Sequence, residues 1–409
     1  MNLTNYDKGG VQVAGTPQYI RNLNENLIID ALIAHGMLSR ADISRQTGLS
    51  KPTVSSAVEH LIARNLVLET GRADNAQGRK ATLIRFNEQA YYICGVDIGA
   101  SRIRIALSNL NGELLDYQTY PMSVQQSESG QGERILQTLR KHLDELLRQN
   151  HLNWDEIQCI GFGIPGVVLP GSGEISRIVA PLAGLEQALS LESLSAAFPC
   201  EVILDNDVNL AALGEYRDGS ASDSELFVFI SLGVGTGAGI MVNGQLLRGM
   251  RGLTGEVAEM MQEGRRLEDV LSAGGLIEMA ANLLNEAQLQ HNDSRILELR
   301  SQLTPEKLFE AARLGNSYAV EIIRKYCHML ALALRNISVL LAPHLIVLGG
   351  GIGGNGDVLL PYLEEMINKP YPAQPELICS KLGERAVVTG AVHIALQQTM
   401  LRLQQETAE

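Results

Sequence analysis

Cysteine, aromatic side chains and long apolar runs are all scarce in this sequence. Its 409 residues include five scattered cysteines and no Cys-x-x-Cys pair, so neither a disulfide framework nor a zinc ribbon is indicated. No apolar run reaches the roughly 18 residues of a membrane span, and the start, MNLTNYDKGG, lacks the basic and apolar segments of a secretory signal. We therefore expect a globular cytoplasmic protein of about two or three domains that does not bind a membrane.

Positive charge is also in short supply, and it is unevenly distributed. The formal net charge of −13 argues against a protein covered with a basic nucleic-acid-binding surface. Residues 17–86 nevertheless contain nine Lys or Arg against six Asp or Glu, so the negative excess lies in the rest of the chain. This asymmetry is typical of a DNA-binding domain attached to an acidic body.

Apolar residues at helical spacing predict a first helix that ends near Gly36. Its buried face is expected to consist of Ile20, Leu23, Leu27, Ala31 and Leu32. A short second helix is predicted after Ser39, which is a suitable N-cap with Asp42 three residues later. Gly48 then allows the chain to turn.

A third helix is predicted after Ser50 and resembles a DNA-recognition helix. Pro52 falls in its first turn, where a missing N–H does no harm. The buried stripe is expected to be Val54, Val58, Leu61 and Ile62. The opposite face is small and polar near the N-terminus, the end that enters the major groove in helix-turn-helix proteins. We expect DNA contacts from Arg45, Lys51, Ser55 and Ser56.

Two strand-like runs joined by a polar loop follow and predict a wing within residues 66–86. Arg79 and Lys80 in this loop are expected to lie in a minor groove or along phosphates, where the negative potential favours them. Residues 17–86 therefore predict a winged helix-turn-helix domain whose partner is a double-stranded DNA operator. A protein-docking module of this size is the alternative, and contacts to phosphates and to bases look the same in sequence.

Glycine-rich turns follow three apolar strands in the rest of the chain. Backbone N–H groups in such turns can approach an anion closely, although one such turn often only lets strands pack together. Three of them favour a nucleotide-type cleft between two α/β lobes. The residues selected in these turns are Asp97, Gly99, Ser101, Gly235, Thr236, Gly237 and Gly350.

Acids and amides also gather in VILDNDVNLAALGE, residues 202–215, around a short strand and the helix after it. Asp and Asn are strong N-caps, so residues 205–209 can simply cap that helix. Capping and ligand binding can coexist at a helix N-terminus.

Several segments resemble the ROK family (repressors, open reading frames, kinases) in order and spacing: DIG, NDVN, GVGTGAGI, NGQLLRGMRGLTGE and VLGGGIGG. The resemblance covers residues 92 to about 397, and the winged helix resembles that of the repressor branch, such as its xylose and N-acetylglucosamine regulators. It implies a two-lobed actin-like ATPase and sugar-kinase fold of the α/β class, with a sugar between the lobes. We expect lobe 1 over residues 87–205, completed by 389–409, and lobe 2 over 206–388.

The resemblance also implies roles for individual residues. Asp207 corresponds to the kinase base that takes a proton from a sugar hydroxyl, and it is catalytic only if the chain is a kinase. Asn206, Glu256 and Glu268 correspond to sugar-binding positions. These residue types suit the role because carboxylates and amides form paired hydrogen bonds with vicinal hydroxyls.

The zinc-binding segment of the family is missing. Most members follow the glutamate with Gly-His and a loop of three cysteines, whereas this chain reads GEVAEMMQEGRRLED, with Ala258 and Glu259 at the Gly-His positions. Tetrahedral zinc needs four donors, so no metal is expected here. Either Glu259 reaches a sugar hydroxyl in place of the imidazole or the pocket takes a different ligand. The crowded acids favour a neutral sugar or derivative unless Arg265 or Arg266 turns inward.

These observations predict a sugar-responsive transcriptional regulator, most simply a repressor, that acts as a homodimer or tetramer because paired half-sites demand two heads. It needs no cofactor. The alternative is an ATP-dependent sugar kinase with a regulatory head, which would use ATP and Mg²⁺; a third possibility is a ligand-independent DNA binder. Ala100 and Arg102 replace the usual kinase glycine and lysine, and phosphoryl transfer depends on accurate positioning.

Overall fold

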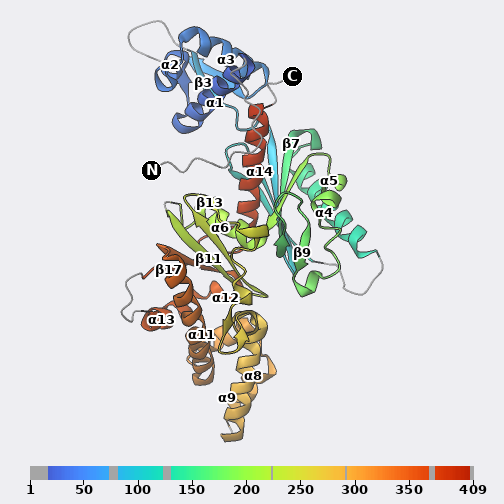
Figure 1. Cartoon of the computed structure of the whole chain (residues 1–409). Helices are drawn as coiled ribbons and strands as arrows, with labels where there is room; N and C mark the ends of the chain where they lie inside the picture. The colour runs from blue at the N-terminus through green and yellow to red at the C-terminus, as the bar shows by residue number, and fades with distance from the viewer. Residues whose placement is uncertain are drawn as a thin grey trace. The chain divides into compact units, whose positions relative to one another are not determined.

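A computed structural model describes residues 17–72, 82–122, 130–222, 224–290, 293–367 and 374–405. The chain divides into two compact units (Figure 1). The first contains residues up to 93, residues 108–113 and residues from 396 onward, and the second contains residues 94–107 and 114–395. No helix within the described ranges is long and apolar enough to cross a membrane.

The first unit has three helices and a three-stranded sheet of order β1-β3-β2. These elements are α1 (Pro17–His35), β1 (Leu38–Ser39), α2 (Arg40–Thr47), α3 (Lys51–Ala63), β2 (Val67–Arg72) and β3 (Thr82–Phe86). Ser39 Oγ accepts a hydrogen bond from Asp42 N at 3.2 Å, and Ser50 Oγ accepts one from Thr53 N at 3.3 Å. The predicted caps, the three helices and the wing strands are confirmed, and the unit is a winged helix-turn-helix.

The predicted buried face of α1 is wrong. Ile20, Leu23 and Leu27 are 52%, 49% and 39% exposed. Leu32, which was also predicted to be buried, is buried. The core side of the helix consists of Ile28, Ile29 and Leu32. Helix α1 carries apolar residues on two sides, and spacing alone does not show which side meets the core. That choice depends on helices distant in sequence.

The second unit is built on two five-stranded sheets with strand orders β10-β7-β4-β5-β6 and β13-β12-β11-β16-β17. The first sheet contains β4 (Tyr92–Ile98), β5 (Arg102–Asn109), β6 (Leu114–Pro121), β7 (Ile157–Ile164) and β10 (Glu201–Asn206). The second contains β11 (Leu226–Leu232), β12 (Thr236–Val242), β13 (Gln245–Leu246), β16 (Leu345–Gly349) and β17 (Glu376–Cys379). β10 pairs with β7, and β16 with β11, in parallel, as in α/β folds.

Two helices, α6 (Asp207–Arg217) and α14 (Ala386–Gln405), supply the packing between these sheets. On the second sheet, Phe227 and Phe229 pack with Leu210 of α6, and the intervening Val228 points into a separate core on the opposite face. On the first sheet, a Cβ on Gly161 of β7 would lie 2.1 Å from the Ala391 carbonyl oxygen, so α14 packs directly on that strand.

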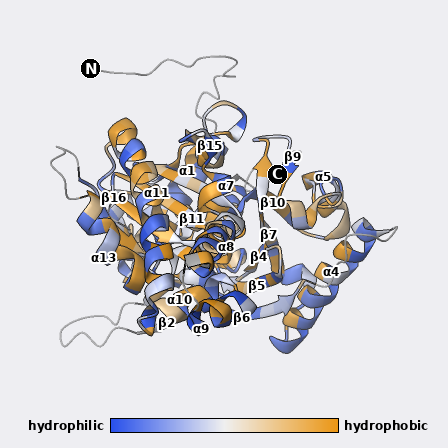
Figure 2. Cartoon of the chain, turned by 90° about the horizontal axis from the view of Figure 1, so that it is seen from below, coloured by the Kyte–Doolittle hydropathy of each residue, from blue (hydrophilic) through white to orange (hydrophobic). Residues whose placement is uncertain are grey.

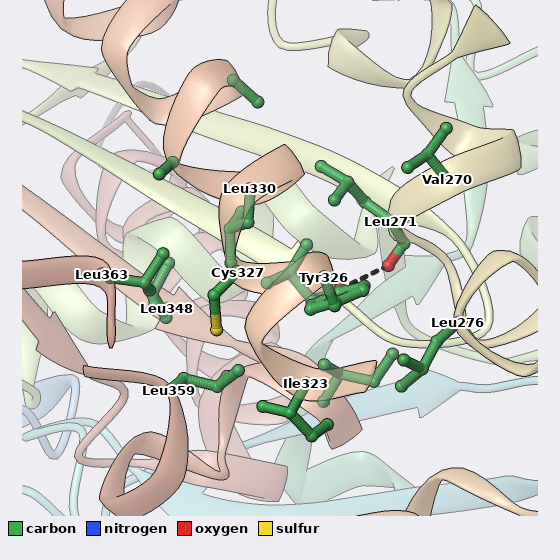
Figure 3. Packing of buried hydrophobic residues seen from close by; sticks show 14 of the residues in the cluster. Val270, Leu271, Leu276, Ile323, Tyr326, Cys327, Leu330, Leu348, Leu359 and Leu363 are labelled. Atoms are coloured by element: carbon green, nitrogen blue, oxygen red, sulfur yellow. Dashed lines mark hydrogen bonds between the residues drawn. The ribbon is translucent and has the colours of Figure 1, made fainter. Parts of the chain in front are cut away.

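Other helices cover the outer faces of the sheets. α8 (Ala273–Gln290), α11 (Ser317–Leu341) and α13 (Gly356–Ile367) cover the second sheet, and Tyr326 of α11 is fully buried there (Figure 3). Its hydroxyl donates a hydrogen bond to Leu271 O at 2.6 Å. α4 (Gln131–Gln149) and α5 (Leu191–Ala197) flank the first sheet on the side away from α14 (Figure 1). Helix α4 is amphipathic, with one hydrophilic and one hydrophobic side (Figure 2).

Shorter elements complete the second unit and carry several site residues. They are β8 (Gly166–Val168), β9 (Ile175–Ile178), β14 (Met261–Gln262), β15 (Arg265–Arg266), α7 (Glu268–Leu271), α9 (Ser294–Ser301), α10 (Pro305–Arg313) and α12 (Gly350–Gly353).

Candidate functional site

Helix α3 presents the polar face that the sequence predicted for DNA recognition. Lys51 and Ser56 are exposed and Ser55 is half-buried. Beneath them Val54, Val58 and Leu61 are buried, as predicted, and Ile62 is half-buried. Pro52 has no N–H and the Thr53 and Val54 amides are bonded to Ser50, so Lys51 supplies the remaining N–H of the first turn, at the positive end of the helix dipole. The geometry therefore suits contact with a nucleic acid, while the individual contacts remain predictions.

Two other groups of predicted DNA contacts differ from this face. Arg45 is 79% exposed and forms an ion pair with Asp42 in the same helix. Arg79 and Lys80 lie outside the described residues.

In the second unit, Asn206 and Asp207 stand where β10 ends and α6 begins. Asn206 Oδ1 accepts a hydrogen bond from Asn209 N at 2.9 Å, and its Nδ2 donates to Gly166 O at 2.9 Å. Asp207 Oδ1 accepts from Val208 N at 2.9 Å. The capping interpretation is thus confirmed for Asn206, which is the N-cap of α6. The cap engages the only side-chain oxygen of Asn206, whereas the bond from Val208 N engages one of the two oxygens of Asp207, whose second oxygen is able to bind a ligand.

Carboxyl groups from three segments share one electrostatic environment. Burial and then the charge of Asp97 raise the pKa of Asp207 to about 8, and Glu256 adds to this effect. Burial also raises the pKa of Glu256; Arg177 opposes this rise, and other nearby carboxylates reinforce it. Like charges raise each other's pKa only at short range. The carboxyls of Asp97 in β4, Asp207 in α6 and Glu256 therefore lie near one another.

An arginine that sequence reasoning did not select holds the acid beside this turn. Arg248 donates to buried Asp205 through two parallel hydrogen bonds, from Nη1 to Oδ1 at 3.0 Å and from Nη2 to Oδ2 at 2.6 Å. Such a fork neutralises a carboxylate that burial would otherwise penalise. The pair connects the end of β10 with the loop that leads to Glu256.

An arginine that was not predicted, Arg104 of β5, lies beside the first glycine turn. Gly99 N donates to Arg102 O at 2.9 Å and closes the hairpin between β4 and β5, with Ser101 exposed at its tip. Arg104 Nη1 donates to Asp97 Oδ2 at 2.9 Å and would lie 3.7 Å from a Cβ on Gly99. Burial raises the pKa of Asp97 to about 6 despite this guanidinium.

The second glycine turn is occupied by an internal carboxylate. Thr236 N donates to Glu268 Oε2 at 2.8 Å, and a Cβ on Gly235 would lie 3.5 Å from the other oxygen of Glu268. Glu268, which was predicted to bind sugar, thus contacts a backbone N–H of a predicted phosphate turn. A Cβ on Gly237 would lie 3.0 Å from Val208, so close packing on α6 is a sufficient reason for that glycine.

Close packing also accounts for the third glycine turn. Gly350 has a φ of +79°, which L side chains rarely adopt, and a Cβ there would lie 2.4 Å from Leu232 O. Its glycine is required whether or not an anion binds.

Glu259 is engaged by arginines. Its carboxylate pairs with Arg177 of β9 at 2.5 Å and with Arg266 at 3.6 Å. Arg266 also pairs with Asp269 at 2.9 Å, and Arg265 pairs with Glu278 at 3.0 Å. Arg265 and Arg266, the two arginines of this loop, are therefore both paired with nearby acids.

The donor set of this loop does not fit the structural zinc of the ROK resemblance. Ala258 supplies no donor, and the carboxylate of the next residue, Glu259, is paired with arginines. Across the described part of the chain, no group of three or more His, Cys, Asp or Glu could hold a metal ion. Zinc binding would require a donor set that this loop lacks.

Comparison with known proteins identifies the body. Residues 93–398 match the ROK family, and residues 22–79 match the MarR family. This chain belongs to the ROK family. The xylose repressor of Caldicellulosiruptor bescii is 26% identical to it over 400 residues, which cover 94% of this chain and 98% of that protein. The DNA-binding transcriptional dual regulator NagC of Escherichia coli is 26% identical, with coverage of 93% and 94%.

Kinases are among the relatives of this ROK body. The glucokinase of Halalkalibacterium halodurans is 30% identical over 322 residues, which cover 74% of this chain and 94% of that protein. Among solved structures, a ROK family transcriptional regulator, a homolog of E. coli MLC protein, gives a TM-score of 0.74 at 23% identity and covers 94% of this chain and 98% of its own. A Streptomyces griseus ROK glucokinase, in complex with glucose and AMPPNP, gives 0.62 at 22% identity, with coverage of 75% and 99%. The fold is therefore a winged helix followed by a ROK sugar-kinase body.

Proposed function

We propose that this ROK protein is a sugar-responsive transcriptional repressor. It binds double-stranded operator DNA through α3 and the wing, and it binds a small neutral sugar or derivative beside Asp207. The proposal is supported by one combination: a single chain carries an exposed polar recognition helix and, in its ROK body, the carboxyls of Asp207 and Glu256, which are close enough for the charge of Glu256 to raise the pKa of Asp207. The matches to the xylose repressor and to NagC support it, because they cover 94% and 93% of this chain, whereas the glucokinase match covers 74%.

The protonation of Asp207 supports a neutral ligand. With a pKa of about 8, this carboxyl group is mostly protonated at pH 7 and is able to donate a hydrogen bond as well as accept one. A sugar hydroxyl also donates and accepts, so Asp207 with Asn206 and Glu256 offers complementary partners. A phosphorylated sugar would bring negative charge toward Glu256, Glu259 and Glu268.

An ATP-dependent sugar kinase is the second candidate, because Asp207 and the glycine turns are present. Two contacts count against it. Arg104 pairs with Asp97 in the first turn, and Glu268 caps the Thr236 amide in the second, so a nucleotide and its Mg²⁺ would have to displace internal charges from both.

One experiment distinguishes the two candidates. The full-length protein is titrated against a duplex that it has selected from a random pool, with and without D-xylose, D-glucose or N-acetyl-D-glucosamine, and ADP release is followed with the same sugars and ATP. A sugar-dependent fall in DNA affinity without ADP release is the result expected for the repressor. ADP release that Asp207→Asn abolishes would instead establish the kinase.

We propose further that the functional protein is a homodimer or tetramer, because a palindromic operator requires two winged helices. Light scattering should give two or four times the 44.4 kDa mass of the chain, and a monomer bound to a single half-site would refute this.

A further inference from the structure

The sugar-site helix α6 and the C-terminal helix α14 are in backbone contact. A Cβ on Gly390 of α14 would lie 1.8 Å from Leu210 O, and a Cβ on Gly214 of α6 would lie 2.3 Å from Ala386 O. The two glycines therefore allow the helix backbones to touch. Ala386 and Ala391 complete this contact from α14 within the same buried cluster as Leu210. A shift of α6, whose first turn carries Asp207, cannot be absorbed by flexible side chains here.

The other end of α14 belongs to the DNA-binding unit. Residues from 396 onward cluster with the winged helix, where Leu403 is buried and Leu396 and Met400 pack against the core that contains Val58 and Leu61 of α3. One continuous helix, Ala386–Gln405, thus contributes to the cores of both units.

A polar contact attaches the recognition helix to this end of α14. Arg64, the C-cap of α3, donates from Nη2 to Leu403 O at 2.6 Å. Its Nη1 lies 3.4 Å from Glu25 Oε2 of α1, and this almost fully buried carboxylate also bonds to His60 Nδ1 at 2.8 Å. Arg64 therefore holds together α1, α3 and the last turns of α14, and its position depends on all three.

We propose that α14 is the element that conveys the state of the sugar site to the recognition helix, with Arg64 as the positioning residue at its DNA-binding end. This inference rests on the proposed function and names the route of its regulation. The glycine contact with α6 transmits a shift of the sugar site to α14, and the carbonyl of Leu403 transmits it to the end of α3. Coupling through packed elements requires two discrete arrangements that ligand and DNA stabilise differently.

Position 397 offers a matched test, because Gln397 is exposed on α14 just beyond the boundary between the units. Gln397→Ala keeps the helix, Gln397→Gly loosens it, and Gln397→Pro breaks a helical hydrogen bond, while none of them removes the glycine contact or Arg64. Arg64→Ala removes the contact at the head, and Arg21→Ala on the exposed side of α1 removes an equal charge as its control.

The readout is the ratio of the dissociation constants for the selected duplex with and without the active sugar of the panel, alongside sugar affinity measured without DNA. Wild type, Gln397→Ala and Arg21→Ala should show a ratio of about fivefold or more. Gln397→Pro and Arg64→Ala should bring it to within about twofold of unity, with sugar affinity changed by less than about twofold. Gln397→Gly should lie between.

Two results would contradict this inference in different ways. A Gln397→Pro protein that is folded by circular dichroism and keeps the wild-type ratio overturns the role of α14 while leaving the proposed function intact. A wild-type chain whose DNA affinity no sugar changes would end both.

Discussion

The polar side chains of the DNA-binding unit and those of the sugar site are arranged in opposite ways. On α3, Lys51 and Ser56 are exposed, and no hydrogen bond or ion pair within the described residues engages them. In the ROK body, Asp205 beside the site is paired with Arg248, and the site residue Glu268 accepts a hydrogen bond from the Thr236 amide. DNA brings charged phosphates that can pair with exposed cations. A neutral sugar brings no charge, so the protein itself must supply the partners that offset the burial of acids at and beside its site.

The strongest test of this difference is Arg248→Ala, which removes the partner of a buried carboxylate. We expect it to lower the free energy of unfolding by about 2–3 kcal/mol, somewhat less than the cost of breaking a fully buried pair, because Arg248 is partly exposed. Urea unfolding of the full-length protein provides the measurement. The double variant Asp205→Asn/Arg248→Ala should lose less than the sum of the single losses, and additive losses would show that the pair is not coupled.

Asp207→Asn should stabilise the protein in a pH-dependent way. Burial raises the pKa of Asp207 from 3.8 to about 8, so its contribution to stability is present below pH 4 and is lost as the pH rises through 8. Asparagine avoids that loss. With allowance for the partial exposure of the residue, we expect a gain on the order of 1–2 kcal/mol at pH 8.5 and almost none at pH 4.5.

Thermal melts at the two pH values measure this gain, and exposed Asp155→Asn serves as the control. An equal gain for Asp207→Asn at both pH values would contradict the raised pKa.

Lys51→Ala tests the exposed cation of the recognition helix. It should weaken DNA binding by about 1 kcal/mol at low salt and reduce the slope of log affinity against log salt by about one, because one phosphate contact is lost. Fluorescence anisotropy over a salt series gives both quantities, with Lys141→Ala, at an exposed position of α4, as the control. An unchanged slope for Lys51→Ala would exclude the phosphate contact.

Arg177→Ala should have the smallest effect on stability. The side chains of Arg177 and Glu259 are 54% and 45% exposed, and ion pairs at such positions are screened by solvent and contribute little to stability. Thermal melts should therefore show a much smaller loss than Arg248→Ala, and a loss equal to that of Arg248→Ala would show that this pair is a structural link like Asp205–Arg248.

The elements of the fold could be predicted from the sequence wherever the signal was local. Ser39 and Ser50 each cap a helix by bonding to the residue three positions later, so the start of the helix can be read from a short stretch of sequence. The glycine turns likewise follow their strands directly. The buried face of α1 could not be predicted, because it depends on contacts with α3 and with the distant residue Leu403.

The site shows the same limit. The acids and the amide were selected from motifs, but their arginine partners were not. Arg248 lies 43 residues from Asp205, and Arg177 lies 82 from Glu259, so only the folded chain reveals these pairs. Arg104 lies seven residues from Asp97 across a tight hairpin, and strand register could have indicated that pair.

The most direct test of coupling between the sugar site and DNA binding is the affinity of the full-length protein for its selected duplex, with and without the active sugar, in wild type and in Glu256→Gln. We expect sugar to weaken DNA binding in wild type by about fivefold or more, Glu256→Gln to remove this response, and sugar-free DNA affinity to be the same in both. A sugar response that persists undiminished in Glu256→Gln would contradict this expectation.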